Sequence, residues 1–209
     1  MIRPVLPWLT FTLALALATG IGCSRPNIEV LHTLSPISLE TAKPTPPLTS
    51  TAMASTTLEV MPVRLPAALQ RPQLVTEGGP GTLSLLETHR WGNGLDKDIQ
   101  RVLVENLSRL TGTDTVVAYP YGERVKATHR LEVDVHRLAG RPGGTLTLEA
   151  TWIVARPQGG QALLFRRTTL QRPVQGQDAE ALVAAHNLII GDLAREIAVE
   201  LMALARGSQ

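Results

Sequence analysis

The stretch "RLEVDVHRLAGRPGGTLTLEATWIV", residues 130–154, decides the fold class, because apolar residues occupy alternate positions in both of its halves. These positions are Leu131, Val133 and Val135 in the first half, and Leu146, Leu148, Ala150, Trp152 and Val154 in the second. A period of two is typical of a β-strand with one buried face. The turns "GRPGG" and "RPQGG" connect these strands to each other and to a third strand at 162–170. Such short, glycine-containing connections predict an antiparallel meander over residues 130–170.

Two amphipathic helices are predicted on either side of this meander in the chain, at 95–110 and 178–205. Their apolar residues recur every three or four positions: Leu95, Ile99, Val102, Leu103, Leu107 and Leu110 in the first, and Leu182, Ala185, Ile189, Leu193, Ile197 and Leu201 in the second. Asp96 and Asp98 suit the first turn of the first helix, where the helix dipole favours acids, and Gly112 ends that helix. Asp178 is expected to cap the second helix. The pattern predicts an α+β fold, in which an antiparallel or mixed sheet is covered on one face by the two helices.

Shorter strands are predicted at 28–34, 58–66, 81–91 and 115–120. Pro62 favours an edge or strand-end position for the second of these. Residues 35–57 are rich in Ser, Thr and Pro, a composition that buries too little apolar surface to offset the entropy of ordering. We therefore expect a single domain over residues 28–205 that contains a flexible loop at 35–57.

The composition indicates a protein that can bury a hydrophobic core and that has no nucleic-acid partner. Of the 209 residues, 44% are hydrophobic but only 3% are aromatic, so the core must be mainly aliphatic. The formal net charge is +2, and no run of Lys or Arg forms a phosphate-binding patch. These values exclude the usual electrostatic features of a nucleic-acid-binding protein.

The first 22 residues have the pattern of a secretory signal, with Arg3 as a positive start, an apolar run over 5–18 and small residues after it. The run is shorter than the ~20 apolar residues of a comfortable transmembrane helix. Cys23 is the only cysteine of the chain and directly follows Gly22. A lone cysteine at this place resembles the cysteine of a lipobox.

The lipobox resemblance implies a lipid anchor. Cleavage would fall between Gly22 and Cys23, and Cys23 would carry a diacylglyceryl group on sulfur and an N-acyl chain such as palmitate. Several acyl chains give a lasting anchor, since each buried CH₂ contributes ~0.8 kcal/mol. Residues 23–27 would form a lipidated tether, and Ser24 implies sorting to the outer membrane. The alternative is an ordinary signal peptide with an incidental cysteine.

The sequence contains no recognisable catalytic motif. Its histidines, which are His32, His89, His129, His136 and His186, include no His-Glu-x-x-His arrangement. Neither a G-x-S-x-G nucleophile elbow nor a P-loop is present. Glu132 and Asp134 share one face of a strand, and we interpret them as its solvated face. We expect no catalytic residue, no metal and no cofactor, and so no enzyme.

The segment "MPVRLPAALQRPQLVT" (61–76) resembles the PqiC/YmbA family of lipoproteins, which are auxiliary components of MCE-type transport systems. The likeness continues in "HRWGNGLDKDIQRVLVENLSRLTGT" (89–113), in "YP" at 119–120, in the strand "LEVDV" and in "ALVAAHN" (181–187). "VLHTLSP" (30–36) is similar to the family's first strand. The resemblance spans nearly all of the chain after the lipobox, and its motifs are specific in combination but weak singly.

The resemblance implies a role at the periplasmic face of the outer membrane. The protein would be a non-catalytic docking subunit of a PqiABC-like intermembrane lipid-transport system that supports envelope integrity. It would assemble as a homo-oligomeric ring and meet an MCE-domain (PqiB-like) protein of the inner membrane. The alternative is a monomeric, periplasm-facing lipoprotein that binds a small apolar ligand.

Five residues of these motifs form the candidate structural or interface motif: Arg71, Pro72, Gln73, Arg90 and Trp91. In the structural interpretation, Trp91 fills the core, Pro72 sets the chain direction and Arg71 bonds backbone carbonyls. In the other interpretation, Arg71 and Trp91 belong to a subunit or partner interface, where both residue types are enriched.

Overall fold

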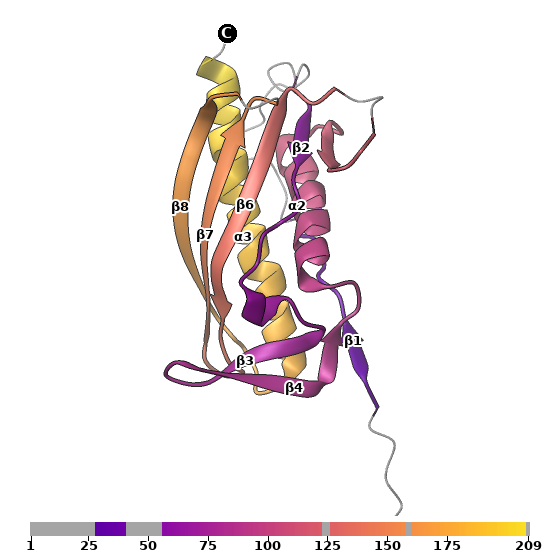
Figure 1. Ribbon diagram of the computed structural model, residues 1–209, viewed down its shortest axis with the longest axis vertical. Coiled ribbons are helices and arrows are strands. Elements are labelled where there is room, and N and C mark those ends of the chain that lie inside the picture. The colour runs from indigo at the N-terminus through magenta and orange to yellow at the C-terminus, as the bar shows by residue number, and fades with distance from the viewer. Residues whose placement is uncertain (1–27, 41–55, 123–125, 158–159, 208–209) are drawn as a thin grey trace, which may run out of the picture.

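The computed structural model describes residues 28–40, 56–122, 126–157 and 160–207. In these ranges the chain forms two sheets and two long helices (Figure 1). The larger sheet has five strands in the order β5-β2-β6-β7-β8, and the smaller sheet has three in the order β1-β4-β3. Sequence patterns do not predict this division into two sheets.

The larger sheet is mixed, which confirms the predicted α+β class. Its strands are β2 (Leu58–Val60), β5 (Val116–Ala118), β6 (His129–Ala139), β7 (Thr145–Ala155) and β8 (Ala162–Pro173). β6, β7 and β8 are the expected antiparallel meander, whereas β2 is parallel to both β5 and β6. β2 ends before Pro62, and the chain continues beside β6, where the amide of Arg64 donates to the carbonyl of Val133 at 3.0 Å.

The alternating residues of the meander face the core as the period of two requires. The five apolar side chains of β7 on the inner face are all fully buried: Leu146, Leu148, Ala150, Trp152 and Val154. In β6 the alternation shifts at a register irregularity between Val135 and Arg137, so that His136 and Arg137 are both exposed and Leu138 is buried.

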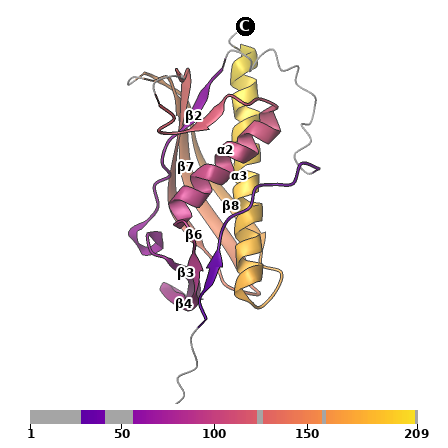
Figure 2. The ribbon, with the colours of Figure 1, turned by 90° about the vertical axis from the view of Figure 1, so that its right-hand side faces the viewer.

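Two helices, α2 (Leu95–Thr111) and α3 (Ala179–Gly207), lie side by side on one face of the larger sheet (Figure 2). Gly112 ends α2 in the left-handed conformation, with φ at 66°, and its amide donates to the carbonyl of Ser108. Asp178 caps α3, since its Oδ1 accepts from the amide of Ala181 at 2.8 Å. Both predicted helices are therefore confirmed.

The smaller sheet lies across one end of the larger sheet, next to the start of α3 (Figure 1). It consists of β1 (Val30–His32), β3 (Gln73–Gly79) and β4 (Thr82–Trp91), and a short 3₁₀ helix, η1 (Ala67–Leu69), precedes β3. Thr76 Oγ1 donates to the carbonyl of Gly140 at 3.0 Å, and Glu77 pairs with Arg137 at 2.5 Å. These contacts join the hairpin of β3 and β4 to the end of β6.

Only part of the Ser/Thr/Pro-rich range 35–57 is described, because residues 41–55 lie outside the described residues. Its first residues contact both helices. Ile37 is buried, and its amide donates to Asn106 Oδ1 of α2 at 2.8 Å.

Candidate functional site

The candidate motif residues do not all meet at one place. Arg71, Pro72 and Trp91 line one surface groove, with a volume of about 900 Å³. The other walls are the segment 63–65 after β2, the connection 92–94 between β4 and α2, and the first residues of α2. Gln73 and Arg90 are not among the lining residues. Gly22 and Cys23 lie outside the described residues, so the lipidation site stays a prediction.

Backbone pairing explains why residues separated along the chain meet in the groove. The amide of Trp91 donates to the carbonyl of Pro72 at 2.7 Å, which closes the open end of the hairpin of β3 and β4. Gln73 and Arg90 are register partners next to this bond. Arg90 pairs with Glu29, just before β1, at 2.7 Å. Arg90 therefore ties the start of β1 to the small sheet.

Each of the two interpretations of the motif agrees with the structure for some of its residues and not for others. Trp91 is only 4% exposed and belongs to the core, as the structural interpretation expects. Arg71 is exposed on the groove wall, and it makes no hydrogen bond or ion pair to another residue of the described ranges. The expected bonds from Arg71 to backbone carbonyls are therefore absent from the described part of the chain. The groove combines a packed aromatic floor with a cation available to a partner.

The charges around the groove are of both signs. Arg64 is engaged by Glu132 at 3.6 Å and Asp134 at 3.3 Å, both on β6. These two carboxylates are thus part of an ion-pair network rather than a free solvated face. Lys97 is exposed at the first turn of α2 and lies on the same groove as Arg71. Such a mixed rim suits a polar protein segment better than an apolar small molecule.

Behind the groove, Trp91 packs against a buried histidine, His186. The rings of Trp91 and His186 meet edge to face, with centroids 5.5 Å apart and planes at 66°. Nδ1 of His186 lies 2.7 Å from the carbonyl of Leu182 in the preceding turn of α3. Burial lowers the pKa of His186 to about 4, although the bond to Leu182 opposes this effect.

The lowered pKa of His186 makes stability depend on pH. The unfolded chain takes up this proton near pH 6.5 and the folded chain only near pH 4, so stability falls as the pH drops through this window. We expect a loss of about 2 kcal/mol between pH 7.5 and pH 5 from this residue. Urea denaturation at both pH values measures this change in the free energy of unfolding.

The matched comparison is His186→Gln against His136→Gln, an exposed histidine of β6. Burial also lowers the pKa of His32 and His129, so the wild type has contributions of the same sign from them. The pH dependence should become shallower only in His186→Gln. An unchanged slope in that variant would rule out the buried neutral imidazole.

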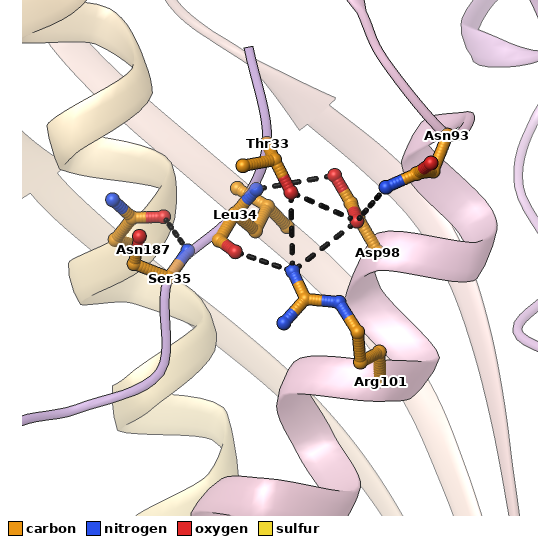
Figure 3. Close-up of polar contacts among 7 residues, drawn as sticks. All are labelled: Thr33, Leu34, Ser35, Asn93, Asp98, Arg101 and Asn187. Carbon is orange, nitrogen blue, oxygen red and sulfur yellow. Dashed lines mark hydrogen bonds and ion pairs between the residues drawn. The ribbon is translucent and has the colours of Figure 1, made fainter.

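A buried carboxylate joins the groove to the segment after β1 (Figure 3). Asp98 is 1% exposed, and its Oδ2 accepts from the amide of Leu34 at 3.1 Å. Its Oδ1 accepts from Thr33 at 3.2 Å and from Asn93, on the groove wall, at 3.5 Å. Arg101 completes the cluster by bonding Asp98 at 3.2 Å and the carbonyl of Leu34 at 2.5 Å.

The sequence does not reveal this role of Asp98. Its position in the first turn of α2 predicts an interaction with the helix dipole and nothing more. Its bonding partners at 33–34 are far away in sequence. On the other side of the segment, Asn187 of α3 accepts from the amide of Ser35 at 2.9 Å, so both helices hold it (Figure 3).

Within the described ranges, neither helix combines the length and the apolar character that crossing a membrane requires.

Comparisons with known proteins identify relatives of the whole fold. The model of a family described as "ABC-type transport auxiliary lipoprotein component" matches residues 38–198. A solved structure from Xanthomonas campestris, assigned to the DUF330 family, is similar with a TM-score of 0.70 at 16% identity, over 86% of this chain and 98% of that chain. A second structure, of an uncharacterized protein, has a TM-score of 0.65 at 22% identity, over 83% of this chain and 99% of that one. No curated protein matches the chain. At these identities the structural neighbours show a shared fold.

Proposed function

Because the chain belongs to the family of ABC-type transport auxiliary lipoprotein components, we propose that it is the accessory subunit of an MCE-type (PqiABC-like) intermembrane lipid-transport system. In this proposal Cys23 anchors the protein in the outer membrane, facing the periplasm. The protein forms a homo-oligomeric ring and docks an MCE-domain (PqiB-like) protein of the inner membrane without catalysing a reaction. The observation that carries the docking role is the groove that collects Arg71, Pro72 and Trp91.

The position of the groove suits a tethered docking protein, because its Pro72 and Trp91 lie directly before β3 and at the end of β4. β1 begins seven residues after Cys23, and it lies at the same end of the molecule as β3, β4 and the start of α3 (Figure 1). The end of α3 lies at the opposite end. A short anchored tether raises the effective concentration of weak docking contacts among neighbouring copies.

The packing favours docking over the binding of a small apolar ligand. The space between the helices and the larger sheet is filled by fully buried side chains, including Trp152, Leu148 and Ile189. The groove is open and has charged residues on its walls. Ligand pockets are mostly apolar and enclose most of the ligand surface, so this groove fits a protein segment better.

Arg71→Ala should weaken capture of the MCE-domain partner by about tenfold, as for an interface arginine of moderate energy. Arg71 is exposed and carries no structural bond in the described chain, so the fold should survive. The tagged full-length protein is extracted in mild detergent, and the co-purifying partner is quantified by mass spectrometry. The intact mass from the same preparation reports acylation of Cys23 and the number of subunits.

Arg167→Ala is the matched control, because Arg167 is an exposed arginine on β8, in the larger sheet away from the groove. It should capture the partner as the wild type does. Equal capture by Arg71→Ala would remove the groove from the proposal. A lipidated wild-type monomer without an MCE-domain partner would overturn the transport role and leave the anchor standing.

A further inference from the structure

Three side chains from three separate elements meet beside the start of β1. They are His32 at the end of β1, His89 near the end of β4 and Glu180 in the first turn of α3. Their ligand atoms all lie within 4.8 Å of one another. Among the described residues this is the one group of three His, Cys, Asp or Glu side chains that converges so closely.

The register of the small sheet brings the two imidazoles together. β1 runs parallel to β4, with Val30 opposite His89 and His32 opposite Trp91. His32 and His89 are therefore diagonal neighbours on one face of the sheet. Their ring planes lie within 16° of each other, and their centroids are 5.1 Å apart. Nε2 of His32 and Nδ1 of His89 are 2.8 Å apart, so the N–H of one ring donates to the lone pair of the other.

The geometry of the pair is close to that of two ligands of one ion. With Zn–N bonds of about 2.0–2.1 Å at tetrahedral angles, two ligand nitrogens stand roughly 3.3 Å apart. To reach this separation from 2.8 Å, the two nitrogens move apart by about 0.5 Å and both rings tilt so that their lone pairs point to the ion. Both histidines are half-buried and Glu180 is exposed, so the carboxylate can approach from the solvent side.

We propose that His32, His89 and Glu180 bind one divalent transition-metal ion, with Zn²⁺ as the best fit. Imidazole nitrogens together with a carboxylate oxygen suit zinc and its neighbours, and not Mg²⁺ or Ca²⁺, which prefer oxygen ligands. Three protein ligands leave a fourth position for water. The ion takes the place of the proton shared between the two imidazoles.

The electrostatics of the cluster favour a cation between the rings. Burial and the neighbouring imidazole of His89 lower the pKa of His32, and the carboxylate of Glu180 opposes this shift. An unprotonated imidazole is the form that binds a metal. The nearby Arg90 is already paired with Glu29, which reduces its repulsion of a cation.

Metal binding here would stabilise the first strand of the described residues. β1 has three residues, and within the described ranges β4 is its one neighbouring strand. An ion held by His32, His89 and Glu180 links β1 at once to β4 and to α3. This inference does not rest on the proposed transport function.

The test is a calorimetric titration of the full-length protein with Zn²⁺, in detergent, without a polyhistidine tag and after removal of bound metal. We expect saturable binding of one Zn²⁺ per chain and a melting temperature that rises with Zn²⁺ concentration, because the ion binds the folded state. His32→Ala and His89→Ala should each weaken binding by more than about tenfold. Glu180→Gln should weaken it in the same direction with little change in apo stability, because Glu180 is exposed.

Two control variants match the chemistry of these substitutions. His136→Ala removes an exposed histidine of β6, and Glu87→Gln neutralises an exposed carboxylate of β4. Both should bind Zn²⁺ as the wild type does. Circular dichroism and melting of the metal-free proteins establish that each variant is folded. Absence of saturable binding to the wild type, or binding that persists in both His32→Ala and Glu180→Gln, would overturn the site.

Discussion

Trp91→Ala should lower the free energy of unfolding by about 3–5 kcal/mol, the range for truncating a buried tryptophan. The side chain is 4% exposed and packs edge to face on His186, so its removal leaves a cavity between β4 and α3. The backbone bond from Trp91 to Pro72 is unaffected by the substitution. Urea denaturation measures the change as a lower midpoint at an unchanged slope.

Leu83→Ala is the control for Trp91→Ala, since Leu83 lies on the same strand and is 46% exposed. It should change stability by less than about 1 kcal/mol. A double-mutant cycle with His186→Ala should give a coupling of about 0.5–1.5 kcal/mol for the ring pair. If Trp91→Ala kept full stability but lost assembly, Trp91 would act at an interface and not in the core.

Asp98→Ala should destabilise the protein by about 2–3 kcal/mol and release the segment after β1. The substitution leaves the buried amide of Leu34 without an acceptor, and Thr33 and Arg101 each lose one of their partners. Hydrogen exchange measured residue by residue should show faster exchange at Leu34. The amide of Ile37, which bonds Asn106 instead, should keep more of its protection.

Asp96→Ala separates this effect from the helix dipole. Asp96 also lies in the first turn of α2, so both variants lose a favourable charge at the helix start. We expect a loss of only about 0.3–1 kcal/mol for Asp96→Ala. Equal losses in the two variants would mean that the bonds from Asp98 to residues 33–34 contribute nothing measurable.

The sequence by itself determined the elements in which apolar residues recur at a regular spacing. One apolar face is buried in each of β6, β7, α2 and α3. The alternation in the strands and the spacing of three or four in the helices indicate which residues form that face. The resemblance read from residues 61–76 and 89–113 likewise identified the family, because its motifs are local.

Tertiary structure decided how these elements combine and where chemistry can occur. The parallel pairing of β2 with β6 and of β1 with β4 depends on contacts between segments distant in sequence, which no local period encodes. For the same reason the sequence did not place Asp98 against Leu34 or bring His32 to His89 and Glu180. A three-residue strand such as β1 has too few side chains to specify its own partner. Its pairing with β4 and the bonds of Leu34 and Ser35 to the two helices, all formed only in the folded chain, determine its position.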